Sequence, residues 1–188
     1  MSELERNPWQ TLSSRVVYET AWMTVREDQV IRPDGQPGIY GFVEKSVATG
    51  VVAVDEQGQV VLVGQYRYPT RRYSWELPEG GSEPGETPLR AAQRELREET
   101  GLAAARWEPL GDVVQLSNCI TSELGYLFLA RGLTQLSAPS PDPTELLRVT
   151  WIPFAEAVRR AVEADISDLM SIAGLLRAAR HPELAAYL

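Results

Sequence analysis

The run GGSEPGETPLRAAQRELREETGL, residues 80–102, decides the fold because it contains a helix whose two ends are both marked in the sequence. Thr87 is a good N-cap residue, and Pro88 suits the first helical position. Gly101 suits the C-terminal cap, where a left-handed backbone is common. An apolar stripe at helical spacing is formed by Leu89, Ala92 and Leu96. The sequence therefore predicts a helix over residues 88–100.

Three glutamates crowd one face of this helix. Glu95, Glu98 and Glu99 occupy positions i, i+3 and i+4, so their carboxylates are neighbours, and each like-charge pair costs about a few tenths of a kcal/mol. One interpretation is a solvated acidic face, because acidic side chains are mostly exposed. The other is a site for a hard divalent cation such as magnesium, which would turn the repulsion into attraction. Magnesium usually takes one or two carboxylates plus phosphate oxygens, so three glutamates suggest more than one ion.

The same run resembles the signature of the Nudix hydrolase family at every fixed position. Gly80 is followed after five residues by Glu86, and after seven more by Arg94. The remaining signature positions are Glu95, Leu96, Glu98, Glu99, Gly101 and Leu102. Since the order of strands and helices around the run also fits, the resemblance covers most of the chain. It implies the Nudix fold, an α/β (α+β) fold whose mixed β-sheet is sandwiched between helices, with an added N-terminal antiparallel β module.

The resemblance also implies a function for the acidic helix. Nudix enzymes hydrolyse a nucleoside diphosphate linked to another moiety, and their loop, helix and loop hold the divalent ions that bridge the pyrophosphate. The implied metal ligands are Glu79, through its backbone carbonyl, with Glu95, Glu98 and Glu99. Arg94 would hold the glutamates by ion pairing, and Glu86 would be a structural partner of the loop. Mg²⁺ is the expected cofactor, with Mn²⁺ as a substitute, because such an ion lowers the pKa of a bound water that attacks phosphorus.

The stretch VLVGQYRYP and the following SWELPEGG resemble the branch of the family that acts on ADP-ribose and other nucleoside diphosphate sugars. In that branch an arginine equivalent to Arg67 contacts substrate phosphate, and we also expect Glu76 and Glu123 among the substrate-binding residues. The alternative for Arg67 is a solvated hairpin edge. Because the chain is acidic and the substrate is an anion, a phosphate role for Arg67 is favoured.

The general base of the family usually lies on a loop beyond the signature, and two glutamates fit. Glu145 ends the proline-rich stretch PDPTE directly before a strand, and Glu123 ends SNCITSE. We prefer Glu145, because a proline-rich loop that ends in a carboxylate resembles a lid over the site. The catalytic residues predicted are therefore Glu98, Glu99, Glu145 and Arg94. A surface glutamate in a mobile loop is the alternative for Glu145.

Substrate specificity stays open at this point. Asn118 and Cys119 stand where ADP-ribose enzymes often carry a proline, so a broader sugar-nucleotide hydrolase is a close alternative. A hydrolase of dinucleoside polyphosphates or nucleoside triphosphates is a second alternative. A Nudix module that senses a nucleotide without cleaving it is a third, although such modules often lose the signature glutamates.

The rest of the chain divides into two expected domains, a β module over residues 1–45 and a Nudix domain over residues 46–188. Alternating apolar and polar residues predict extended strands in the first. In the second, residues 50–54 and 59–65 read as a hairpin around EQG, and two helices are predicted over residues 154–164 and 167–180. Enzymes of this branch pair their N-terminal module across a two-fold axis, which implies a homodimer.

Composition limits the partners. The 188 residues are 44% hydrophobic and 23% charged, which suffices for a buried core, and the net charge of −8 argues against nucleic acid as a partner. A small-molecule nucleotide must therefore be attracted by local cations. No apolar run approaches the ~20 residues of a membrane helix, and the polar start of the chain is unlike a secretory signal. With Cys119 as the only cysteine, we expect a cytoplasmic protein that has no membrane partner.

Overall fold

The computed structural model describes residues 6–188, which fall into two compact units. The small unit comprises the chain up to Ser46 together with Gln115–Glu123, and the large unit comprises Val47–Val114 and Leu124–Leu188. No helix in the described part of the chain is long and apolar enough to span a bilayer.

The small unit is a three-stranded antiparallel sheet. Its strands are β1 (Gln10–Glu19), β2 (Thr24–Ile31) and β3 (Pro37–Glu44), in that order. Two bulges interrupt the pairing of β1 with β2, whereas β2 and β3 pair without a break. Among the described residues of this sheet, Val30 is the one buried hydrophobic residue, and β1 is exposed along its whole length. The sheet therefore has no core of its own comparable with that of the large unit.

The segment Gln115–Glu123 joins the small unit through β3. The backbone N–H of Val43 donates to the Ile120 carbonyl at 2.8 Å, and the N–H of Ser122 donates to the Val43 carbonyl at 3.0 Å. The Tyr40 hydroxyl donates to the carbonyl of Cys119 at 2.8 Å. These bonds satisfy backbone groups along one edge of the sheet, so this segment is part of the unit's structure.

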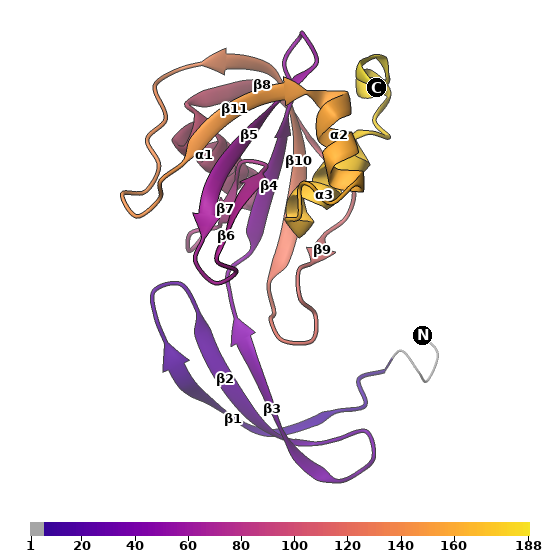
Figure 1. Ribbon diagram of the computed structural model, residues 1–188. Coiled ribbons are helices and arrows are strands. Elements are labelled where there is room, and N and C mark those ends of the chain that lie inside the picture. Colours follow the sequence, from indigo (N-terminus) through magenta and orange to yellow (C-terminus); the bar gives the residue numbers. More distant parts are fainter. Residues whose placement is uncertain (1–5) are drawn as a thin grey trace. The chain divides into compact units, whose positions relative to one another are not determined.

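The large unit contains two sheets (Figure 1). In the first, the order is β7 (Glu79–Gly81), β4 (Ala48–Ala53), β10 (Leu124–Gln135) and β8 (Leu102–Pro109), and β9 (Val114–Gln115) also pairs with β10. In the second, the order is β11 (Arg148–Pro153), β5 (Gln59–Arg67) and β6 (Arg72–Glu76). The pair β4 and β10 is parallel and its neighbours are antiparallel, so the first sheet is mixed, as predicted.

The hairpin predicted over residues 50–54 and 59–65 is wrong. Only one isolated bridge joins Val54 to Val60, after which β4 and β5 diverge into different sheets. The reason is that both strands are apolar on both faces, and strands of that kind are covered on two sides. A short turn at Asp55 connects them, and there the Asp55 side chain accepts hydrogen bonds from the N–H groups of Gln57 and Gln59.

Helix α1 (Pro88–Thr100) confirms the helix predicted over residues 88–100. The Thr87 hydroxyl accepts from the N–H of Arg90 at 3.3 Å, and Gly101 closes the helix with φ of +74°. The predicted apolar stripe differs in one respect, because Leu89 is exposed. The buried positions of the helix are instead Ala91, Ala92, Leu96, Glu99 and Thr100.

Helices cover both faces of the first sheet. Alternate residues of β4 face opposite sides, so Val51 and Ala53 pack in a cluster with Ala92 and Leu96 of α1. On the other face, Val52 lies beside Gly174 of α3 (Leu169–Ala178). The predicted arrangement of a mixed sheet between helices is therefore confirmed.

The C-terminal region contains α2 (Phe154–Val162), α3 and a 3₁₀ helix over Pro182–Tyr187. The first two are each shorter than predicted, and the 3₁₀ helix is an additional element. A left-handed residue, Ala164 with φ of +63°, follows α2 and separates it from α3. Asp168 caps α3 by accepting a hydrogen bond from the N–H of Ser171 at 2.7 Å.

Candidate active site

Glu95 and Glu99 of α1 lie against the strand that carries Glu79 and Gly80. A Cβ atom added at Gly80 would overlap the carboxyl group of Glu95, so the absence of a side chain at residue 80 leaves the space that this carboxyl group occupies. The carboxylate of Glu99 accepts from the backbone N–H of Glu79 at 3.0 Å. This contact fixes the acidic face of the helix against β7.

The acidic helix face is partly buried, which distinguishes it from a solvated acidic surface. Glu99 is only 2% exposed, and desolvation, followed by the charge of Glu95, raises the pKa of its carboxyl group well above the ordinary value. Desolvation also raises the pKa of Glu95, although the ion pair with Arg94 opposes the change. Buried carboxylates are stable as anions only when a cation or hydrogen-bond donors compensate them. Oxygen donors of this kind fit a hard divalent ion.

Arg94 contacts both the loop before α1 and the glutamates of the helix. Its guanidinium group contacts Glu95 at 2.7 Å, Glu98 at 3.0 Å and Glu86 at 3.0 Å. It also donates to the carbonyl of Gly81 at 2.8 Å. Hydrogen bonds from Arg94 lower the pKa of Glu86. The Glu86 carboxylate is therefore held by Arg94 in this arrangement.

Arg67 occupies the end of β5 and is held by two carboxylates. Its Nε donates to Glu76 at 3.0 Å, and its Nη2 lies 3.1 Å from Glu79. Glu76 is 2% exposed, whereas the Arg67 side chain is 38% exposed. The buried glutamate therefore fixes one side of the guanidinium group and leaves part of it accessible to a ligand.

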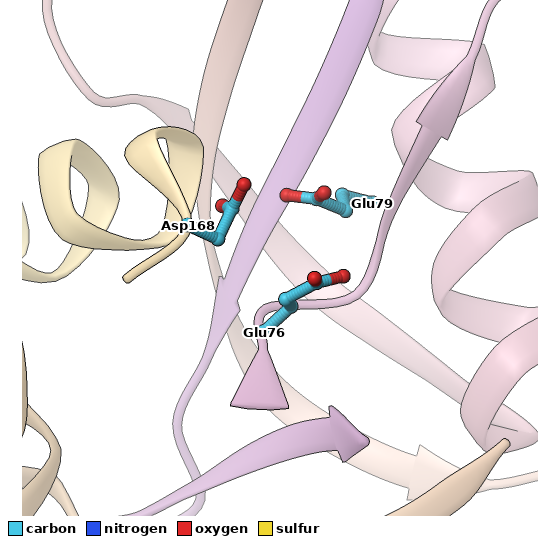
Figure 2. Close-up of side chains that lie close together, drawn as sticks. All are labelled: Glu76, Glu79 and Asp168. Carbon is cyan, nitrogen blue, oxygen red and sulfur yellow. The ribbon is translucent and has the colours of Figure 1, made fainter. Parts of the chain in front are cut away.

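Asp168 is a member of this region that the sequence did not indicate. Figure 2 shows the carboxylates of Glu76, Glu79 and Asp168 pointing toward one another from the end of β6, from β7 and from the start of α3. One oxygen of each lies within 4.8 Å of the others. In addition, Oε2 of Glu79 is buried without a hydrogen-bond partner among the described residues. The carboxylates outnumber the two arginines, so the region as a whole carries a negative charge.

The placement of Asp168 depends on how α3 docks. The buried hydroxyl of Ser171 accepts from the backbone N–H of Leu77 at 2.8 Å, which ties the start of α3 to the segment between Glu76 and Glu79. A sequence signal for the N-cap existed, because an aspartate directly precedes an apolar helical stretch. No local pattern indicates which strand that cap will meet.

Glu145 and Glu123, the two candidates for the general base, lie in different units. Glu145 is in the large unit, and desolvation, followed by the charge of Asp142, raises its pKa. Among the neighbouring charges, that of Glu145 also raises the pKa of Glu95 and of Glu99, after the desolvation of each. Glu123 belongs to the small unit, where it pairs with Lys45 at 3.1 Å.

The large unit therefore collects most of the residues that the sequence singled out. Within it, α1 presents Glu95, Glu98 and Glu99 with their arginine partner, and the ends of β5, β6 and β7 present Arg67, Glu76 and Glu79. An acidic, partly buried surface with fixed arginines suits a site that binds cations and phosphate together.

Comparisons with known proteins agree with this geometry. A family model described as "NUDIX domain" matches residues 44–171, and one described as "Nucleoside diphosphate sugar hydrolase N-terminal domain" matches residues 9–43. The chain is 35% identical over 175 residues to an ADP-ribose pyrophosphatase of Mycobacterium tuberculosis, which covers 92% of this chain and 84% of that protein. It is 27% identical over 159 residues to an ADP-ribose pyrophosphatase of Bacillus subtilis, which covers 84% and 85%, respectively.

A solved structure described as "ADP compounds hydrolase" shares the fold. It matches this chain with a TM-score of 0.81 and 21% sequence identity, over 96% of this chain and 97% of that one. Since the NUDIX domain model covers more than half of the chain and includes the whole of the acidic helix, the chain belongs to the Nudix family.

Proposed function

We propose that the protein hydrolyses the pyrophosphate bond of ADP-ribose or another nucleoside diphosphate sugar and releases a nucleoside monophosphate and a sugar phosphate. The match of residues 9–43 to a nucleoside diphosphate sugar hydrolase domain supports this substrate class. The similarity to two ADP-ribose pyrophosphatases over most of the chain supports it further.

One observation carries the proposal, namely the burial of Glu99 against the backbone of Glu79 beside the carboxyl group of Glu95. This arrangement gathers ionisable oxygens where a metal ion would compensate them. The residues that would hold Mg²⁺ or Mn²⁺ are Glu95, Glu98, Glu99 and the backbone carbonyl of Glu79. When bound, such an ion neutralises phosphate charge and makes a coordinated water more acidic.

The remaining roles fall to residues that need no metal. Arg67, which is fixed by Glu76 and still partly accessible, would bind a phosphate of the substrate. Arg94 would hold Glu95 and Glu98 in place. Glu145 would accept a proton from the attacking water, because its raised pKa brings it closer to the working pH of a general base.

A substrate screen tests the proposal. Purified protein with magnesium would be offered ADP-ribose, UDP-glucose, GDP-mannose, NADH, diadenosine polyphosphates and nucleoside triphosphates, and the products would be separated by chromatography. We expect AMP and ribose 5-phosphate from ADP-ribose, or the matching pair from another nucleotide sugar. Cleavage of only the triphosphates or the dinucleoside polyphosphates would replace this proposal, and binding without cleavage would indicate a sensing module.

We further propose that the protein is a cytoplasmic homodimer. The exposed apolar side chains of β1 support the dimer, because an interface would remove such side chains from water. They include Leu12, Val16, Val17 and Tyr18. A lone exposed cysteine, Cys119, agrees with a reducing compartment. Sedimentation equilibrium of the full chain would test the oligomeric state.

A further inference from the structure

The loop between β10 and β11 is fixed near the acidic helix at a specific point. The backbone N–H of Ser140 donates to the carbonyl of Glu98 at 2.7 Å, so the loop is attached to the last turn of α1. Glu145 follows five residues later. Five residues can extend only a short distance from the bonded Ser140, so Glu145 stays near the end of α1. Turns within these residues then determine the position of Glu145.

Between Ser140 and Glu145 the chain forms a turn in which the Asp142 side chain accepts hydrogen bonds. Oδ1 of Asp142 accepts from the N–H of Thr144 at 2.8 Å and from the Thr144 hydroxyl at 2.6 Å. The carbonyl of Asp142 accepts from the N–H of Glu145 at 2.8 Å. The flanking Pro141 and Pro143 restrict the backbone on both sides. Four consecutive residues are thus held in one conformation by the Asp142 carboxylate, the Asp142 backbone carbonyl and two prolines.

This turn contributes little to the core. Asp142, Thr144 and Glu145 are all exposed, and Leu146 next to them is 89% exposed. The conformation of the turn therefore depends on its hydrogen bonds and on the two prolines and owes little to packing. The backbone N–H of Glu145 is the group that the turn ends on, so the turn sets where Glu145 lies relative to Ser140, which is bonded to Glu98 of α1.

We propose that Asp142 is a positioning residue, whose side-chain hydrogen bonds to Thr144 shape the turn that carries Glu145, on a loop that is bonded to α1 through Ser140 and Glu98. The inference rests on the proposed function, in which Glu145 accepts the proton of the attacking water. With the turn formed during folding, the ordering of this segment is not repeated in each catalytic cycle.

Two substitutions at Asp142 separate its geometry from its charge. Asp142→Ala removes the acceptor of both Thr144 bonds, and we expect kcat for ADP-ribose to fall by about 10- to 100-fold, with KM changed less than about twofold, because general-base catalysis is lost and phosphate binding is kept. Asp142→Asn keeps an acceptor oxygen on the same side chain. It is expected to hold kcat within about threefold of the unmodified protein.

A double-mutant cycle with Glu145→Gln completes the test. In the Glu145→Gln background, Asp142→Ala is expected to have no further effect on kcat. The matched control is Asp34→Ala, which removes an equivalent exposed turn, the bond from the N–H of Gln36 to Asp34 at 3.0 Å, in the small unit. We expect this control to keep full activity.

The outcomes distinguish this inference from the proposed function. If the unmodified protein cleaves no nucleotide sugar, the proposed function fails. If it does cleave, but Asp142→Ala lowers kcat as much in the Glu145→Gln background as alone, Asp142 does not act through Glu145 and the inference is overturned. Equal activity of Asp142→Ala and the unmodified protein would also overturn it.

Discussion

Glu99 lies where an ionised carboxylate is costly, and this cost is the basis of the site. The residue is 2% exposed, and a hydrogen bond from the Glu79 backbone compensates only part of the desolvation. The signature predicted which glutamates lie on one helix face, since helical geometry alone determines that. Burial could not be predicted, because it depends on how α1 packs against β7, where the Glu79 N–H donates to the Glu99 carboxylate.

Replacing Glu99 by Gln tests the metal assignment. Gln keeps an acceptor for the Glu79 N–H and suits a helix, so we expect an unchanged circular dichroism spectrum and normal thermal unfolding. Because one charged group at the reacting phosphate is lost, kcat should fall by at least about 100-fold. Steady-state kinetics at saturating magnesium measures this loss. The control is Glu83→Gln, at an exposed position in the loop between β7 and α1. Undiminished activity would rule out the assignment.

A second prediction at the residue scale concerns protons and magnesium. Burial raises the pKa of Glu79 and Glu99, so without metal the folded state binds more protons than the unfolded state. The contribution of these groups to stability is therefore present below their unfolded pKa and is lost as the pH rises toward their folded pKa. A divalent ion that binds the ionised Glu99 carboxylate restores the part of that stability that Glu99 contributes. We expect magnesium to raise the unfolding temperature more at about pH 8 than at about pH 5.

Thermal unfolding with and without magnesium chloride, across this pH range, measures the difference. In the Glu99→Gln variant the pH dependence of the magnesium effect should be smaller. A magnesium effect of equal size at both pH values would contradict the prediction.

At the scale of elements, the helix with marked ends was predicted correctly and the neighbouring hairpin was not. The caps of α1 act within a few residues, so Thr87 and Gly101 could be recognised in the sequence. The turn after β4 has the local signs of a hairpin, but tertiary packing separates the two strands into different sheets. The sequence did contain one sign against a simple hairpin, because β4 and β5 are apolar on both faces, which is typical of strands that are covered on two sides.

Gly101→Ala is predicted to destabilise the fold more than Gly85→Ala. Both glycines have positive φ, which costs a residue with a Cβ about 1–2 kcal/mol. A Cβ at Gly101 would also overlap the carbonyl oxygen of Ser137, whereas nothing lies within 4 Å of a Cβ at Gly85. Chemical denaturation of both variants measures the free energies of unfolding. Equal losses would show that the contact with Ser137 relaxes at no cost.

At the scale of the molecule, the small unit has a sheet without a matching core. The alternating pattern predicted its strands, but not that the exposed face of β1 would carry so many apolar side chains. The joining of Gln115–Glu123 to β3 could not be read from the sequence either, because the pairing spans many residues and has no local pattern.

Leu12→Asp is predicted to convert the proposed dimer into a monomer. Leu12 is 56% exposed on β1, so a charge there should leave the fold of the unit intact and oppose burial in an interface. Sedimentation equilibrium would show the lower mass, and Ser13→Asp, a neighbouring exposed position on the same strand, would show whether added charge alone is sufficient. A dimer that survives Leu12→Asp would place the interface elsewhere.

The bonds between Val43 and the stretch ending at Ser122 have a consequence for biosynthesis. The sheet of the small unit, β1 to β3, emerges from the ribosome early. One of its edges nevertheless stays unpaired until residues far downstream have been translated. The sheet is therefore completed late in translation, although its strands are synthesised first. For the same reason, cutting the gene after residue 46 would not release an intact N-terminal module, since that fragment would lack a part encoded in the second half of the gene.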